Sequence, residues 1–187
     1  MEVVGSWVSE SLKKNSFPTL NCSFSQGLVL MTRSIVEGLL DVLEDQRKEV
    51  RALFSLTDDQ LNWVPQKSRN CIANLIEHIT GAEAYWIQEV VMGTPVGRVR
   101  DNEFQYRYRS KKELQNAYEY MAKATMNILQ NKLTDEMLFD QRKAREQQFS
   151  IHWILLHMVE HNYYHIGQMN YIRGLLGTDS FISPPED

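Results

Sequence analysis

The segment from Ile151 to Leu176 constrains the fold more than any other part of the chain, because its apolar residues recur at the spacing of an α-helix. Ser150 precedes the run as an N-cap, and Gly177 follows it as a stop signal. We therefore predict one long helix with an apolar stripe facing a core. The residues within about 60° of Ile151 on a helical wheel are Ile154, Leu155, Met158, Ile166, Met169, Ile172 and Leu176.

The same segment holds four of the five histidines of the chain, and three of these are spaced four residues apart. His165 lies about 40° from the centre of the apolar stripe, His161 about 80° and His157 about 120°. His157 and His165 are separated by a rise of about 12 Å, which is too far for both to bind one ion. We therefore predict that His161 and His165 form a metal-binding pair and that His152 is solvated.

Two histidines four residues apart also occur on helices that bind no metal. In that case each imidazole packs beside the core, and each ring nitrogen needs a hydrogen-bond partner if burial is not to be costly. A third ligand would favour the metal-binding interpretation. The only histidine outside the segment is His78.

Three earlier segments also have helical periodicity, and no segment alternates as a strand would. Capping boxes are expected at Thr57–Gln60, before a short turn, and at Ser110–Glu113. Four long helices and no strands predict an all-α protein with the architecture of a four-helix bundle. The earlier helices are expected at about Gln26–Phe54, Asn70–Met92 (capped by Asn70) and Ser110–Asn131.

Two connections in this prediction are long. Residues 93–109 separate the second and third helices by roughly 17 residues, more than antiparallel neighbours need, so we expect this link to cross the bundle. The densest basic cluster of the chain, Arg98–Lys112, is predicted to be a solvated part of that connection. The polar segment Lys132–Gln148 is expected to lead to Ser150, the cap of the last helix.

Composition limits the classes of function. A chain of 187 residues with 43% hydrophobic residues can bury one core, and we expect an N-terminal arm (1–24), a bundle (25–178) and a C-terminal tail (179–187). A net charge of -4 offers no basic face for nucleic acid or acidic lipid, and no apolar run is long enough to span a membrane. Cys22 and Cys71 have no metal or redox spacing. We expect reduced thiols in a cytoplasmic protein.

Two stretches of the sequence resemble a known family. The stretch NLIEHITGAEAYWI (74–87), together with HMVEHNYYHIGQMNYIRGLLG (157–177), is similar to motifs of the DinB/YfiT-like superfamily of metal-binding four-helix bundles. The resemblance covers roughly residues 28–177. It implies helices in up-down-down-up order, with a long link between the second and the third.

The resemblance also implies a metal site. In that family one divalent ion is bound by a histidine of the second helix and an HxxxH pair of the last, which correspond here to His78, His161 and His165. Zinc or nickel suits such nitrogen ligands. Glu83 lies inside the apolar stripe of the second helix, and the family's antiparallel arrangement would bring it near His157. We expect a buried carboxylate hydrogen-bonded to His157 in preference to a fourth ligand.

The resemblance leaves the reaction open between two types. The family contains metal-dependent hydrolases and enzymes that transfer low-molecular-weight thiols such as bacillithiol or mycothiol, and its members often form homodimers. Three neutral imidazoles leave a position for water or a thiolate on the ion. Glu160 and Tyr164 point away from the core stripe, so neither is expected to act as a base. The competing hypothesis is a non-catalytic bundle that binds metal or a small ligand in a stress response.

Overall fold

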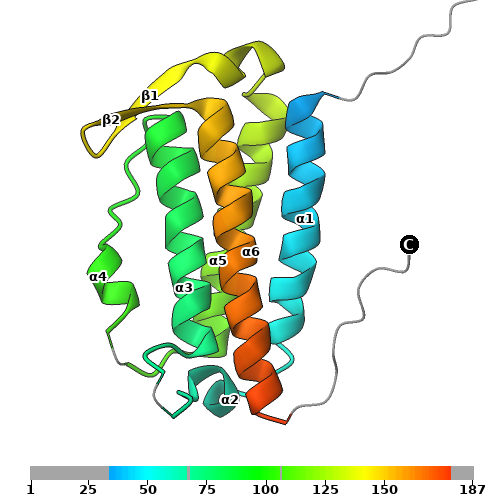
Figure 1. Cartoon of the computed structure of the whole chain (residues 1–187), viewed down its shortest axis with the longest axis vertical. Helices are drawn as coiled ribbons and strands as arrows, with labels where there is room; N and C mark the ends of the chain where they lie inside the picture. Colours follow the sequence, from blue (N-terminus) through cyan, green and yellow to red (C-terminus); the bar gives the residue numbers. More distant parts are fainter. Residues whose placement is uncertain (1–33, 67, 106, 178–187) are drawn as a thin grey trace, which may run out of the picture. The chain divides into compact units, whose positions relative to one another are not determined.

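The segments with apolar periodicity form four long helices (Figure 1). The computed structural model describes residues 34–66, 68–105 and 107–177. The second helix changes character after Glu83, because its last two turns are a π-helix. The long elements are α1 (Ile35–Leu53), α3 (Ile72–Glu83) with η1 (Ala84–Val91) continuing it, α5 (Lys111–Asn131) and α6 (Ile151–Leu175).

The helices form the predicted four-helix bundle in up-down-down-up order. In Figure 1, α1 and α6 run in one direction and α3 and α5 in the other. α3 packs against both α5 and α6, and α1 packs against the same two helices. The pair α3 and α6 is therefore antiparallel, which places the second half of α6 beside the first half of α3.

The predicted arm (1–24), the tail (179–187) and the expected helix start at Gln26 lie outside the described residues. Those that are described belong to one compact unit, and their apolar side chains form its core. The stripe predicted for α6 is buried throughout, apart from Leu176, which is partly buried. No helix in the described ranges is long and apolar enough to cross a membrane.

Most helix starts follow the sequence signals. Ser34 and Thr57 form capping boxes at the starts of α1 and α2 (Asp58–Asn62), and Ser150 caps α6 through its hydroxyl. Asp135, at the start of the 3-10 helix η2 (Asp135–Phe139), accepts hydrogen bonds from the first two backbone N–H groups of α1. This contact ties the segment that follows α5 to the start of α1.

Two of the predicted caps were wrong. Cys71, not Asn70, is the N-cap of α3, because the Cys71 thiol accepts from Asn74 N while the Asn74 side chain accepts from Cys71 N. Ser110 is the N-cap of α5 by position, but its side chain makes no capping hydrogen bond. The capping box expected with Glu113 is therefore not formed.

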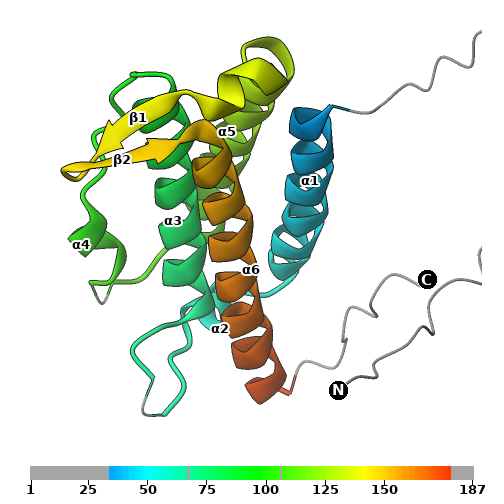
Figure 2. The ribbon, with the colours of Figure 1, turned by 45° about the horizontal axis from the view of Figure 1, so that its top comes forward.

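The prediction that the chain contains no strands was also wrong. The polar segment before α6 folds into an antiparallel hairpin of β1 (Gln141–Ala144) and β2 (Gln147–Ser150), which reaches across the end of η1 (Figure 2). Its strands are four residues long and mostly polar, so they lack the apolar alternation that marks a half-buried strand. The turn contains Arg145 and Glu146, both with positive φ, at 48° and 67°.

The link from residue 93 to 109 returns along the outside of α3, as Figures 1 and 2 show, and contains the short helix α4 (Arg100–Glu103). A return is required because α3 and α5 run in parallel. The basic cluster in this link is not uniformly solvated, contrary to the prediction. The side chains of Arg98 and Arg109 are only 9% and 4% exposed, because they pair with Glu103 and Glu77.

Candidate metal centre

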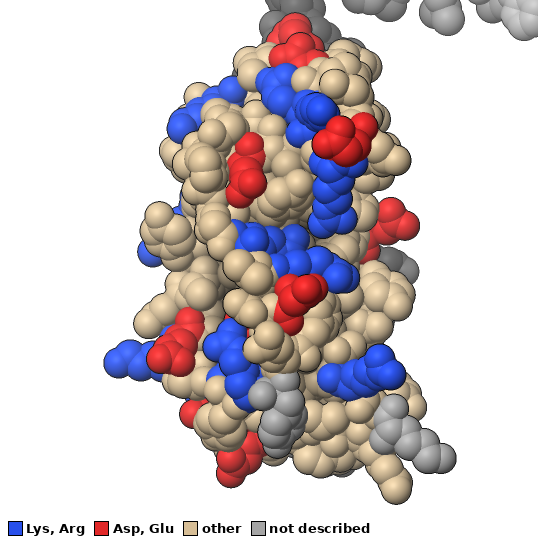
Figure 3. Space-filling view, turned by 90° about the vertical axis from the view of Figure 1, so that its left-hand side faces the viewer, with Lys and Arg blue, Asp and Glu red and all other residues tan. Residues whose placement is uncertain are grey.

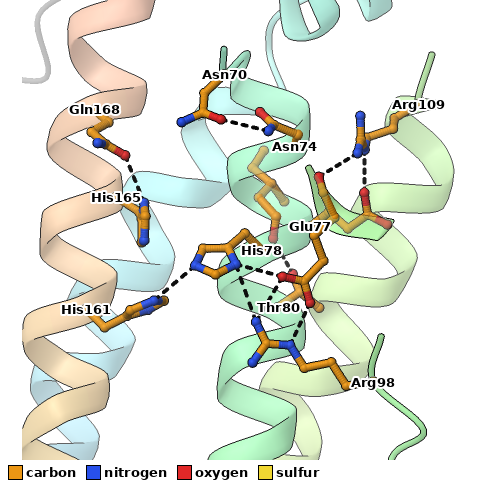
Figure 4. Close-up of polar contacts among 12 residues, drawn as sticks. Asn70, Asn74, Glu77, His78, Thr80, Arg98, Arg109, His161, His165 and Gln168 are labelled. Atoms are coloured by element: carbon orange, nitrogen blue, oxygen red, sulfur yellow. Dashed lines mark hydrogen bonds and ion pairs between the residues drawn. The ribbon is translucent and has the colours of Figure 1, made fainter. Parts of the chain in front are cut away.

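The structure brings together the three histidines predicted to bind metal. His78 extends from α3 toward His161 and His165 on α6 (Figure 4), and one ring nitrogen of each lies within 4.8 Å of the others. Nε2 of His78 is 3.1 Å from Nε2 of His161. Two nitrogens bound to one tetrahedral zinc ion lie about 3.3 Å apart, so this pair already has nearly the separation of two ligands.

Hydrogen bonds behind two of the rings orient their free nitrogens toward the centre. Nδ1 of His78 lies 2.7 Å from Oε2 of Glu103, and Nδ1 of His165 lies 2.9 Å from Oε1 of Gln168. Both oxygens are acceptors, so each Nδ1 carries the proton. The lone pair of each ring is then on Nε2, which is the arrangement common among histidines that bind metals.

Glu103 is itself fixed by two further contacts. Arg98 donates to it from Nε at 2.6 Å and from Nη2 at 2.9 Å. Burial works to raise the pKa of the Glu103 carboxyl, but the hydrogen bonds from His78 and Arg98 hold it below its usual value. The carboxylate also lies against Gly81, where an added Cβ would be 2.6 Å from Oε1. This approach requires glycine at that position.

His161 is held in the neutral form that a metal ligand requires. Burial, together with the positive charge that His165, His78, His157 and Arg98 can carry, lowers its pKa to about 3. Its Nδ1 is buried and has no hydrogen-bond partner among the described residues. Each histidine can offer one ring nitrogen to an ion, which for His78 and His165 is the unprotonated Nε2, so this set of three neutral imidazoles fits a divalent ion.

Glu83 does not have the predicted partner. Its carboxylate accepts from Arg47 Nη2 at 2.8 Å and from Asn162 Nδ2 at 3.2 Å, whereas His157 stacks on Trp153 with ring centres 4.8 Å apart. Five residues separate Glu83 from His78, which turns it about 140° around the helix. It therefore faces α1 and the bundle interior, so it belongs to a buried ion pair and not to the histidine cluster.

Sequence patterns missed the residues that support the histidines. Gln168 had a detectable signal, since a position three residues after His165 lies on the same face of a helix. Glu103 and Arg98 had none, because they lie in a link without periodicity. His152, expected to be solvated, lies outside the histidine cluster and is partly buried.

A sequence model described as mycothiol-S-transferase matches residues 38–177, which include all three clustered histidines and the residues that support them. The chain belongs to the mycothiol-S-transferase family. This membership also supports the predicted DinB/YfiT-like superfamily. No curated protein matches the chain.

Solved structures with the same fold are distant in sequence. A DinB-like protein from Bacillus cereus is 20% identical, with a TM-score of 0.63, and the match covers 79% of this chain and 95% of that one. A conserved protein from Enterococcus faecalis is 12% identical, with a TM-score of 0.66, covering 79% of this chain and 99% of the other. At these identities the likeness concerns the fold of the family's bundle.

Proposed function

We propose that this protein binds one divalent ion through His78, His161 and His165 and transfers a low-molecular-weight thiol to an electrophilic small molecule. The observation that carries the proposal is the convergence of three imidazoles, one of them held neutral by burial, in a chain of the mycothiol-S-transferase family. Zinc or nickel is the proposed ion, because both accept nitrogen ligands readily.

The ion would supply one kind of chemistry, the stabilisation of the thiolate form of a thiol near neutral pH. The protein supplies orientation. Glu103 holds the proton of His78 on Nδ1, and Gln168 does the same for His165. Arg98 keeps the Glu103 carboxylate ionised and in place. In the proposed transfer the thiol releases its proton to solvent, its sulfur forms a bond to an electrophilic carbon, and the leaving group departs from that carbon with the bonding electrons.

Transfer of a thiol fits the surroundings of the histidines better than hydrolysis does. A hydrolase commonly uses a general base to take a proton from water. Glu103 is already engaged by His78 and Arg98, and Glu160 and Tyr164 are both exposed, although the Tyr164 ring lies 5.1 Å from that of His165. A thiol that ionises readily has no need of such a base.

The decisive experiment is a thiol-transfer assay with the purified protein loaded with Zn²⁺ or with Ni²⁺. Mycothiol, bacillithiol, glutathione and cysteine would each be offered with monochlorobimane as the electrophile. We expect turnover with at least one sugar-linked thiol, loss of turnover with a chelator or in His161→Ala, and normal turnover in His152→Ala. Metal-loaded protein that transfers none of these thiols, or transfers them equally well in His161→Ala, would overturn the proposal.

The assembly state is a further part of this proposal. A homodimer is expected from the resemblance to the family, and sedimentation equilibrium of the metal-loaded protein measures it directly. A monomer over the whole concentration range would remove the dimer without affecting the proposed reaction.

A further inference from the structure

A cavity of about 300 Å³ lies on the face shown in Figure 3, and one of its lining residues, Arg98, has Nη2 3.4 Å from Nδ1 of His78. Its wall is built by η1, by the link before and within α4, and by the turn of the hairpin. We call it the arginine pocket, after Arg98, Arg100 and Arg145, which line it together with Tyr85 and Glu89. Basic side chains gather around the middle of this face.

The positive charge of the pocket is only partly compensated within the described residues. Arg98 is paired with Glu103, and Glu89 accepts a hydrogen bond from Val96 N at 3.0 Å. Arg100 and Arg145 form no ion pair with any described carboxylate. Arg100 and Arg145 thus line one open cavity, and its carboxylate, Glu89, forms an ion pair with neither of them.

Aromatic rings lie between these two arginines and the histidines of α3 and α6. The Arg145 guanidinium carbon lies 5.7 Å from the centre of the Tyr85 ring and 6.0 Å from that of Trp86, whose ring is 5.6 Å from His157. Arg100 lies 5.2 Å from the centre of the Phe104 ring, and that ring is 4.7 Å from His78.

One aromatic ring therefore separates Arg100 from His78 of the cluster, and one ring separates Arg145 from His157, whose own ring lies 5.7 Å from that of His161. Stacking on a ring uses the face of a guanidinium and leaves the N–H groups at its edge free to bind a ligand.

Two unusual backbone features also meet at this pocket. Arg145 and Glu146 have positive φ values, in a two-residue turn where asparagine and glycine are the usual residues. Tyr85 and Glu89 belong to a π-helix, a conformation found frequently at functional sites. Backbone strain persists where the surrounding structure enforces it, often at ligand sites. Here the strained turn presents Arg145 to the cavity.

We propose that the arginine pocket binds an oxyanion group, a carboxylate or a phosphate, on a small-molecule substrate whose reactive end reaches the histidines. Planar guanidinium groups bind such oxyanions through paired hydrogen bonds. The volume suits the anionic part of a small ligand. The assignment of this group to a substrate rests on the proposed function, whereas the binding itself does not.

The test is calorimetric titration of the metal-loaded protein with succinate and with inorganic phosphate at low salt, and with uncharged succinamide. We expect succinate or phosphate to bind and succinamide not to. Arg100→Gln and Arg145→Gln should each raise the dissociation constant about fivefold or more. The matched control is Lys143→Gln, an exposed lysine of the same hairpin paired with Glu146, which should change it by less than about twofold.

A second set of titrations separates the pocket from the metal. In metal-free His161→Ala, the binding that depends on Arg100 and Arg145 should persist. Binding that disappears in that variant but survives in Arg100→Gln and Arg145→Gln would place the anion on the metal and overturn the pocket. Variants that lower the melting temperature but leave affinity unchanged would show that the arginines only support the fold, which also overturns it.

Binding and turnover can fail independently. Arginine-dependent binding without thiol transfer would leave the pocket standing and reject the proposed function. Where thiol transfer does occur, comparing mercaptosuccinate with 2-mercaptoethanol as the thiol shows whether the anionic group belongs to the thiol. A preference for mercaptosuccinate that is lost in Arg145→Gln assigns the pocket to the thiol, and an unchanged preference assigns it to the electrophile.

Discussion

Oε2 of Glu103 lies 2.7 Å from Nδ1 of His78, 25 residues earlier in the chain, and the contact is buried. It is the only hydrogen bond to a carboxylate made by any of the three clustered histidines within the described residues. Through it, the link between α3 and α5 determines which nitrogen of His78 faces the site. The candidate metal centre thus depends on a segment outside the four long helices.

Replacing Glu103 by Gln should weaken metal binding about 10- to 100-fold, because the acceptor behind a metal-binding histidine fixes the ring and raises its basicity. Competition with a chromophoric chelator measures this affinity. Glu113→Gln is the control, since Glu113 is an exposed carboxylate at the start of α5. Equal affinities for the two variants would show that Glu103 acts only in the ion pair with Arg98.

Gly81→Ala should reproduce the effect of Glu103→Gln without removing any polar group. The added methyl group would lie 2.6 Å from Oε1 of Glu103, so the carboxylate must move away from His78. The same chelator competition detects the loss. Gly38→Ala on α1, where the new atom meets nothing within 4 Å, should leave metal affinity unchanged and stabilise its helix by about 0.5–1 kcal/mol. A Gly81→Ala protein with full affinity would contradict the role assigned to Glu103.

The purified protein should carry about one divalent ion per chain, as expected for a site with three histidines. His78→Ala, His161→Ala and His165→Ala should each reduce the metal content sharply, because two imidazoles bind an ion far less well than three. His152→Ala should not. Elemental analysis of the four variants checks this, and unchanged metal in the first three would eliminate the site.

Glu83→Gln should lower the free energy of unfolding by about 3 kcal/mol, because it breaks a buried ion pair and leaves Arg47 partly uncompensated. Chemical denaturation measures the loss. Metal content should not change, since Glu83 faces away from the histidines. Glu44→Gln is a suitable control, as Glu44 pairs with the same arginine from a more exposed position and should cost less than about 1 kcal/mol. Loss of metal at unchanged stability would place Glu83 in the metal centre.

The ion pair between Arg51 and Glu119 should make part of the stability dependent on pH. Hydrogen bonds from Arg51 at 2.8 and 2.9 Å lower the pKa of Glu119, against an opposing effect of burial. A carboxyl with a lowered pKa in the folded protein contributes stability that is complete above the unfolded value, near about 4.3, and is lost as the pH falls through the folded value.

The difference in urea midpoint between the parent and Glu119→Gln should therefore shrink as the pH is lowered from about 6 to about 3. Glu113→Gln, on the same helix, should show no such convergence. A difference that stays constant over this range would mean that the pair contributes nothing through its charge.

Helical periodicity predicted the two clustered histidines that lie on α6. The stripe of α6 fixes the direction of each side chain around the axis, so the inward placement of His161 and His165 followed from spacing alone. His78 required the resemblance to a family, because no spacing relates it to α6. Sequence patterns did not distinguish Cys71 from Asn70 as the cap of α3, because either residue could have capped the helix. The reciprocal hydrogen bonds between Cys71 and Asn74 decide it.

The failed predictions have two physical causes. For Glu83, the prediction used its distance from His78 along the helix axis but not the angle between them around that axis. That angle is about 140°, so the Glu83 side chain faces Arg47. For Glu103, Arg98 and the hairpin, the information lies in contacts between segments that have no periodicity of their own. Such contacts are set by the packing of the bundle, so a pattern within one segment does not reveal them.

Parallel α3 and α5 require a connection that travels the length of the bundle. A bundle of strictly alternating helices would join the same two ends by a tight turn and would have no residues alongside His78. In this chain the length required by the topology is used to place the Glu103 carboxylate and the Arg98 guanidinium behind His78. Shortening that link would therefore alter the chemistry of the site even if every helix and every histidine stayed in place.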